Sequence, residues 1–420
     1  MAARLSELAK GLTVETAFQV LARARELASQ GKEVVELEIG DSPFDATSKA
    51  REAAIEAINA GKTHYCPSDG IPEFKKAIAD THNKKYGLSL GPENVVVGPG
   101  AKIFEQLFCE ALVNPDEAVL IFNPYFPTYV PNIMRRGART VFTPLLEKND
   151  FRPDFAHMQK VLDEEPKLTA VFLNSPHNPT GGVLTKSDLE TLAQMADEHD
   201  LYLLSDEPYV DMVWQGEHRS IIQEAGMLER SVAAYTMSKS FSMSGFRLGY
   251  SLTSPEIAEV LGKLINTNLS CTAPFAQEGG RAALLYDGEE SQSQMSQFKR
   301  KVEILATGLN EIPEVSVKVP RATFYVFANF KEVCNRLKMV SHGLALFLLE
   351  AADDKFGVAC LGGECFGTEG YGFLRFSCAQ PDEKMLQAVE FISQAIKREE
   401  RASSYLEAHP DFALKEPYAM

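Results

Sequence analysis

The 420-residue chain has no long hydrophobic run: nowhere does it contain the roughly 18 consecutive apolar residues that a membrane-spanning helix needs. Its start, MAARLSELAKGLTVETAF, also lacks the apolar core of a secretory signal. Internal repeats and low-complexity linkers are absent as well. We therefore expect a soluble protein that is not exported and has no membrane partner.

Positive charge is in short supply. The chain has 42 Lys and Arg against 58 Asp and Glu, a formal net charge of -16. Such a surface repels phosphate backbones, which argues against a nucleic-acid partner. A local cationic pocket for a small anion remains compatible with this balance.

Paired cysteines are also missing. The seven cysteines are odd in number and form no CxxC pair, a pattern typical of reduced thiols in a cytoplasmic protein. They are Cys66, Cys109, Cys271, Cys334, Cys360, Cys365 and Cys378.

The sequence does contain an alternation of helical and strand-like segments from about residue 46. Several strand-like runs are apolar throughout, as in strands that helices cover on both faces. The runs lie near 94–98, 118–124, 169–176, 201–207, 231–236 and 247–253. Between them lie helical patterns such as KSDLETLAQMADEHD. The alternation predicts an α/β fold with a large, mostly parallel sheet flanked by helices.

Both ends of the chain differ from this pattern. Residues 14–31 predict an amphipathic helix that ends at Gly31, followed by the extended piece VVELEIGDSPFD. After about residue 290, VSVKVP, TFYVFANF and GFLRFSCA predict strands of a smaller α+β domain. We expect residues 1–45 to form an arm and part of the small domain, 46–290 the large domain, 291–400 the small domain, and 401–420 a polar tail.

Polar residues stand directly after five of the apolar runs. Ligands of open parallel sheets bind outside the carboxyl ends of the strands, so these groups are expected at one edge. They are Gly98-Pro99-Gly100-Ala101-Lys102, Asn123-Pro124-Tyr125-Phe126, Asn178 with Pro179-Thr180-Gly181, Asp206 with Tyr209, and Thr236 with Ser238 and Lys239.

Each group has an ordinary structural explanation when taken alone. Gly98 and Gly100 suit a tight turn, Asp206 a helix cap, and Phe126 a core position. Together they match pyridoxal phosphate, which needs a lysine for a Schiff base and a carboxylate for its ring nitrogen. Its phosphate needs a glycine-rich loop entering a helix, hydroxyl groups and an arginine, here Arg247.

The motifs SKSFSMSGFRLGY, NSPHNPTG, SDEPY and FLRFSCA resemble those of the class I/II pyridoxal-phosphate-dependent aminotransferases of fold type I, aspartate aminotransferases among them. The resemblance runs from about Val14 to about Ile396. It implies that Lys239 forms the Schiff base and moves the substrate proton. It also implies that Asp206 pairs with the ring nitrogen, that Asn178 and Tyr209 bind the ring oxygen, and that Phe126 stacks on the ring.

The resemblance also assigns the phosphate. Ala101 and Lys102 would donate backbone N–H groups, while Thr236 and Arg247 would bind by side chain. Tyr65 matches a tyrosine that similar enzymes send to the phosphate of a neighbouring subunit, which implies a homodimer with shared active sites.

Three residues are expected to bind the substrate. Gly40 would lie near the carboxylate with its backbone, Asn178 would contact the substrate, and Arg375 would grip the carboxylate bidentately. The chain departs from the family pattern at GDSPFD, Ala322 and Pro99, none of which is a chemical group of the site.

The predicted reaction is transfer of an amino group between an L-amino acid and a 2-oxo acid in a ping-pong sequence. The motifs leave related reactions open: a C–S lyase, a decarboxylase, a racemase or a carbocyclic amino-acid synthase. A transcription regulator is disfavoured, because only about 30 residues precede the first core strand. Lys102 either reaches the distal carboxylate of aspartate or glutamate, or is an exposed residue of a first helical turn.

Overall fold

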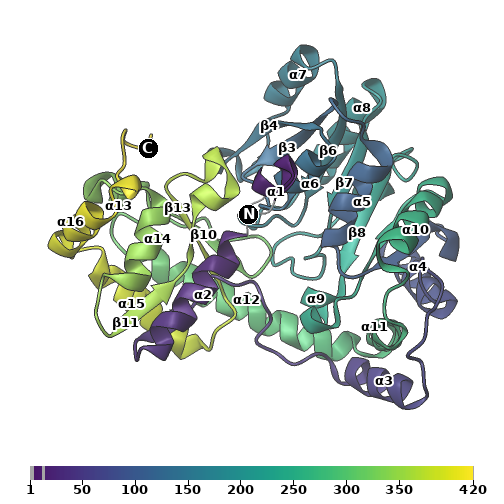
Figure 1. Ribbon diagram of the computed structural model, residues 1–420, viewed down its shortest axis with the longest axis horizontal. Coiled ribbons are helices and arrows are strands. Elements are labelled where there is room, and N and C mark those ends of the chain that lie inside the picture. Colours follow the sequence, from purple (N-terminus) through teal and green to yellow (C-terminus); the bar gives the residue numbers. More distant parts are fainter. Residues whose placement is uncertain (1–3, 12–14, 420) are drawn as a thin grey trace.

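The computed structural model describes residues 4–11 and 15–419. Two bodies lie side by side in Figure 1: a large sheet with its helices, and a region built mainly from the C-terminal part of the chain. The helix expected at 14–31 is α2, Thr16–Ser29, with Val14 outside the described residues. It packs against the C-terminal region rather than against the sheet.

The large sheet has eight strands in the order β2-β9-β8-β7-β6-β3-β4-β5. Strands β4, β3, β6, β7 and β8 run parallel, whereas β9 and the short β5 pair antiparallel with their neighbours. The strands are β2 Val95–Gly98, β3 Ala118–Asn123, β4 Arg139–Leu146, β5 Arg152–Pro153, β6 Leu168–Asn174, β7 Tyr202–Asp206, β8 Ser231–Thr236 and β9 Gly249–Leu252. The predicted α/β fold with a mostly parallel sheet is confirmed.

Helices cover both faces of this sheet, which explains its uniformly apolar strands. In β3, Leu120 packs into the core on one face, while its neighbours Val119 and Ile121 pack into the core on the other. Helices α5 Lys102–Leu112, α6 Tyr129–Arg135 and α10 Pro255–Leu269 cover one face. Helices α4 Pro72–Tyr86, α7 Phe155–Glu164, α8 Lys186–Glu198 and α11 Pro274–Tyr286 pack on the other.

The C-terminal region contains a three-stranded antiparallel sheet in the order β10-β13-β12 and a parallel pair of β1 with β11. Its strands are β1 Glu33–Glu36, β10 Tyr325–Asn329, β11 Phe356–Ala359, β12 Leu361–Gly362 and β13 Phe373–Ser377. Its helices are α12 Gly288–Asn310, α13 Lys331–Leu337, α14 Ser341–Glu350 and α15 Asp382–Ala395. Since β1 lies near the N-terminus, both parts of the chain build this region, and the boundaries between domains stay a prediction.

The structure differs from the expected strands in at least two places: one predicted strand is not formed, and one strand that is formed was not predicted. VSVKVP is not a strand, because only Ser316 bridges to Asn329 before the chain becomes exposed at Val319 and reaches Pro320. A proline has no N–H to continue such a ladder. Strand β4 was not expected from the sequence; several of its side chains are only half-buried, and Thr143 and Pro144 interrupt its apolar residues.

The segment expected as a polar tail is folded. Helix α16, Glu399–Ala408, buries Ala402 and Tyr405 against the C-terminal region. Further on, the Tyr418 hydroxyl donates to Glu364 at 3.0 Å. None of the described helices is long and apolar enough to cross a lipid bilayer.

Candidate active site

The parallel strands of the large sheet end at one edge, where a cavity of about 470 Å³ opens. Segments of the N-terminal and C-terminal parts of the chain complete its walls. All the predicted site residues line it except Tyr65. They are Gly40, Ala101, Lys102, Phe126, Asn178, Asp206, Tyr209, Thr236, Lys239, Arg247 and Arg375.

Lys239 stands on the single turn α9, Met237–Ser240, directly after β8. The turn is capped by Thr236, whose hydroxyl accepts a bond from the Ser238 N–H at 3.2 Å. The Lys239 ammonium donates to the carbonyl of Gly40 and lies 5.2 Å from the centre of the Phe324 ring. The lysine therefore points into the cavity.

The Gly40 backbone lies very close to Tyr325 of β10. A Cβ at position 40 would collide with the Tyr325 hydroxyl, so glycine is required there. The Tyr209 hydroxyl is 3.4 Å from that same hydroxyl. The two phenols and the glycine backbone thus form one wall beside Lys239.

Asp206, the last residue of β7, is buried at the far side of the cavity. Its Oδ2 accepts a hydrogen bond of 2.7 Å from the Tyr129 hydroxyl, and the Asn174 amide donates to its carbonyl oxygen at 2.8 Å. Burial raises the pKa of Asp206 to about 6, against the Tyr129 hydrogen bond and the charges of Lys102 and Lys239. A cation placed against this carboxylate would keep it ionised.

A third corner combines a helix start with a guanidinium group. Gly100 has a φ of +89°, and a Cβ there would lie 2.6 Å from a nitrogen of Arg247. Arg247 donates to the carbonyls of Pro99 at 3.2 Å and Ser244 at 2.8 Å. Helix α5 begins at Lys102, so its first backbone N–H groups, the guanidinium and the Thr236 hydroxyl line one corner. That donor set suits a phosphate.

Arg375 of β13 lies at the opposite end and is only 3% exposed. It donates to Asn178 Oδ1 at 3.1 Å and to the Glu38 carbonyl at 2.6 Å. Its guanidinium stacks 4.3 Å from the centre of the Tyr325 ring, while its Nε is buried without a partner. A buried arginine with an unsatisfied donor at a cavity suits a carboxylate ligand.

Lys102 is bound by another part of the protein. Its Nζ lies 2.9 Å from Glu15 Oε2 and 5.1 Å from the centre of the Phe126 ring. The side chain is 46% exposed, at the start of α5. The structure is compatible with both explanations of Lys102, as an exposed residue of a first helical turn and as a residue that reaches a substrate carboxylate, because it lies in a first turn and also lines the cavity.

Tyr65 does not join the site within one chain. It is 88% exposed and lines a separate hollow of about 230 Å³ together with Lys62, Glu278 and other residues. A role for Tyr65 at a phosphate therefore requires a second copy of the chain.

Several cavity-lining or supporting residues were not identified from the sequence, among them Glu15, Glu105, Tyr129, Asn174 and Tyr325. Asn174 had a usable signal, because it is the last residue of a predicted apolar strand. Tyr325 is a strand residue of the other region, and only the three-dimensional fold brings it to the sheet edge.

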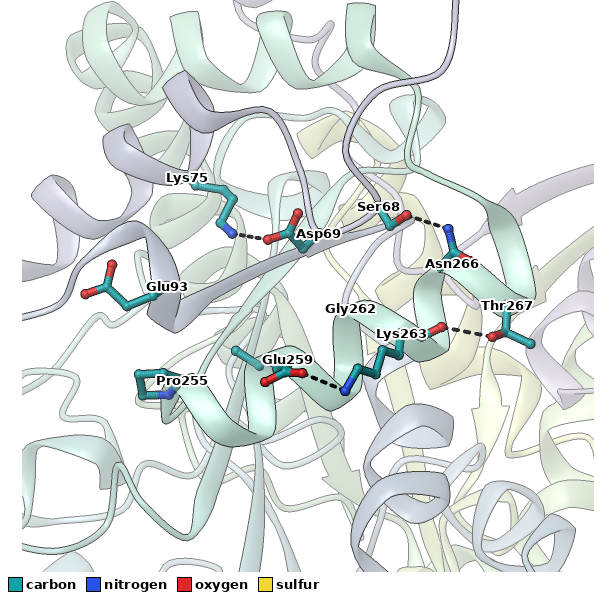
Figure 2. A pocket seen from close by; sticks show the side chains of 11 residues that line it. Ser68, Asp69, Lys75, Glu93, Pro255, Glu259, Gly262, Lys263, Asn266 and Thr267 are labelled. Carbon is teal, nitrogen blue, oxygen red and sulfur yellow. Dashed lines mark hydrogen bonds and ion pairs between the residues drawn. The ribbon is translucent and has the colours of Figure 1, made fainter.

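A larger cavity of about 690 Å³ lies between the start of α4 and helix α10. Four of its charged groups form two ion pairs: Lys75 with Asp69, and Lys263 with Glu259 at 2.6 Å (Figure 2). Glu93 also lines the cavity, and Figure 2 draws no bond from it to the other lining residues. We do not assign this cavity chemistry.

Comparisons with known proteins identify the family of this chain. The family model for class I and II aminotransferases matches residues 32–392. An aspartate aminotransferase of Pyrococcus horikoshii is 32% identical over 89% of this chain and 93% of its own length. An aromatic-amino-acid aminotransferase of Thermococcus litoralis is 34% identical over 88% of this chain and 93% of its own.

A solved structure of a Thermus thermophilus aspartate aminotransferase with maleate superposes with a TM-score of 0.86. It is 30% identical, and the match covers 94% of this chain and all of that one. The matched segment includes Gly40, Lys239 and Arg375, and with them the corners of the cavity. The chain belongs to the class I and II aminotransferase family.

Proposed function

We propose that this aminotransferase uses pyridoxal phosphate in the 470 Å³ cavity to move an amino group between an L-amino acid and a 2-oxo acid. When bound, the cofactor supplies an aldehyde that condenses with amines and a ring that withdraws electrons. The observation that carries the proposal is the cavity itself, which combines a lysine, a buried carboxylate and a phosphate-type corner.

Lys239 serves as the amine and as the proton carrier. Its Nζ lies against the Gly40 carbonyl and near the rings of Tyr209 and Phe324, so it is oriented before a substrate arrives. An amine held in place can take a proton from the substrate Cα and deliver it to another carbon within reach.

Asp206 stabilises a positive charge on the cofactor ring. Its carboxylate, fixed by the Tyr129 hydroxyl, is placed to hold the proton on a ring nitrogen. Asn178 and Tyr209 then lie on the side that would hold the ring oxygen, while Phe126 stacks on the ring. Ala101, Lys102, Thr236 and Arg247 hold the phosphate.

Arg375 binds the substrate α-carboxylate. Its unsatisfied Nε and its position beside Asn178 support this role. The choice of aspartate or glutamate as a substrate rests on Lys102 alone. Glu15 already pairs with that lysine, so an acidic substrate side chain would compete with Glu15 for the Lys102 ammonium.

A homodimer with shared sites belongs to the proposal. Apolar side chains are exposed on α3, Ser48–Asn59, near Tyr65 and at the end of α11; they are Ile55, Ile58, Leu285 and Tyr286. The two helices pack on each other, and both lie at one end of the molecule in Figure 1. An apolar surface of this kind suits a partner copy, which would send Tyr65 to the other phosphate. A cytoplasmic location fits the seven free cysteines.

The experiment adds one amino acid at a time to the purified protein loaded with pyridoxal phosphate, without a 2-oxo acid. Accumulation of pyridoxamine phosphate with release of the 2-oxo acid is the expected result. Release of a thiol with ammonia, of carbon dioxide, or of the D-amino acid, without accumulation of pyridoxamine phosphate, would reveal a lyase, a decarboxylase or a racemase. Sedimentation at assay concentration tests the dimer, and a fully active monomer would contradict shared sites.

A further inference from the structure

A second carboxyl group, that of Glu105, lines the same cavity as Asp206. Glu105 lies in the first turn of α5 and is buried. Its Oε2 accepts two hydrogen bonds, from the Thr128 hydroxyl at 2.6 Å and from the Asn132 amide at 2.8 Å. Both donors are neutral and come from the beginning of α6.

The same short segment also holds Asp206. Thr128 binds Glu105, and the next residue, Tyr129, donates to Asp206 at 2.7 Å. Figure 1 shows α5 and α6 beside each other, and their packing fixes both carboxyl groups relative to one another. Consecutive side chains thus place two acids at one end of the cavity.

The two acids differ in how many cations compensate their charge: Lys102 acts on both, whereas Lys239 acts on Asp206. Both Lys239 and Lys102 lower the pKa of Asp206. Within residues 4–11 and 15–419, no ion pair to Glu105 is found, and the ammonium of Lys102 lies instead against Glu15. Two buried carboxyl groups in one site do not both ionise readily, so the less compensated one keeps the proton.

The surroundings of Glu105 have a net effect that raises its pKa. Burial and the charge of Asp206 raise the pKa of Glu105 to about 8, while Thr128, Lys102 and Asn132 oppose the rise. On its own helix, Cys109 is a neutral thiol, since burial and Glu105 raise its pKa too.

We propose that Glu105 is a positioning residue for Asp206 that carries its proton on Oε1 at neutral pH, so that this end of the cavity holds one negative charge instead of two. Oε2 is assigned as the acceptor because both donors bind it. The protonation of Glu105 does not depend on the proposed function. Its consequence does, because the proton on Glu105 sets how much negative charge faces a cofactor ring nitrogen.

The first test needs no cofactor. Glutamate carboxyl carbons of the apoprotein are labelled with ¹³C and titrated by NMR from pH 5 to 9.5, in the wild type and in Glu105→Gln. We expect a resonance that titrates above pH 7 in the wild type and is missing in the variant. Glu38→Gln and Glu207→Gln identify two other buried glutamates, whose pKa burial raises to about 7. A Glu105 resonance that is already ionised at pH 6 would overturn the proposal.

The second test is reciprocal. Asp206→Asn removes the neighbouring negative charge, so Glu105 is expected to lose its proton at a clearly lower pH. Asp211→Asn is the matched control, because Asp211 pairs with Lys85 instead of facing Glu105. An unchanged Glu105 titration in Asp206→Asn would show that the two acids do not interact and would refute the positioning role.

A third variant covers the case in which Glu105→Gln does not fold. Thr128→Val removes one donor that favours the ionised carboxylate, so the Glu105 resonance should titrate at higher pH than in the wild type. In the protein loaded with pyridoxal phosphate, the visible absorption should change with the same midpoint. A titrating Glu105 in a protein with no transaminase activity would leave this inference standing while the proposed function fails.

Discussion

The two ends of the cavity are built in different ways. The cofactor end takes Asp206, Thr236 and Lys239 from the ends of neighbouring strands of one sheet, together with the start of α5. The substrate end takes Gly40 and Arg375 from segments 335 residues apart, because Gly40 follows β1 and Arg375 lies in β13. One end is therefore local to a single sheet, and the other depends on the C-terminal region.

The charged side chains of the cavity differ in whether a charged partner already compensates them. At the cofactor end, Asp206 and Arg247 bind neutral partners and stay available to a ligand of opposite charge. Lys102, at the start of α5, differs from both because its ammonium is already paired with the carboxylate of Glu15. This ion pair lowers the positive charge that a substrate side chain meets. No sequence motif contains the pair, so the motifs identify the cofactor-binding residues better than the substrate preference.

The strongest way to break the cofactor end is Lys239→Ala. Without its amine the protein should lose at least about 10⁴-fold in turnover, since Lys239 is both nucleophile and proton carrier. Absorption spectra and single-turnover rates measure the loss. Borohydride reduction followed by peptide mapping should label Lys239 in the wild type, and Lys102→Ala is the control lysine variant. Label on any other lysine would contradict the assignment.

Arg375→Ala breaks the substrate end instead. An unpaired carboxylate in a buried site costs several kcal/mol, so kcat/KM should fall by about a thousandfold for every amino acid alike. Arg375→Lys should recover only a small part, because an ammonium cannot replace the planar fork. Cofactor affinity, measured by fluorescence titration, should stay within about threefold of the wild type, a loss of under roughly 1 kcal/mol. A large loss of cofactor affinity would show that the two ends are not separate.

These two ends also explain what the sequence could predict. Lys239, Asp206 and Asn178 follow apolar strands in short, ordered motifs, and parallel strand ends meet at one edge. Most strands of the large sheet were located from their apolar runs for the same reason. Each of these inferences needs only local patterns and one rule of sheet geometry.

The remaining features depend on distant contacts. The pairing of Lys102 with Glu15 joins residues 87 positions apart, and Tyr325 reaches Gly40 only through the packing of β10. Glu105 reads as an ordinary surface acid of an amphipathic helix until α6 places Thr128 and Asn132 on it. No periodicity or motif records such contacts.

Glu15→Gln sharpens the comparison at the level of substrate choice. The change frees the Lys102 ammonium from its carboxylate partner, so kcat/KM for aspartate and glutamate should rise by about tenfold relative to alanine, roughly 1.4 kcal/mol. Lys102→Ala should lower the same ratio. Steady-state assays with the three amino acids measure it. If neither variant alters the ratio, Lys102 does not read the substrate side chain, and the preference for acidic substrates should be abandoned.

The smallest effect is expected from Tyr418→Phe, which tests whether the folded C-terminal segment supports the substrate end. The Tyr418 hydroxyl donates to Glu364 Oε1 at 3.0 Å, and the Ser341 hydroxyl donates to Glu364 Oε2 at 2.6 Å. Glu364 lies in the turn Gly363–Phe366, and the Phe366 ring lies 5.1 Å from the Arg375 guanidinium.

Loss of one such hydrogen bond should lower the free energy of unfolding by about 1 kcal/mol. If the support extends to Arg375, the KM for amino acids should also rise by about twofold, with kcat unchanged, because only carboxylate binding depends on that guanidinium. Tyr371→Phe, at a ring that is 43% exposed, is the control. Denaturant unfolding and steady-state kinetics separate the two effects. A loss of stability without any change in KM would confine Tyr418 to the C-terminal region and would leave the substrate end dependent on β13 and β10 alone.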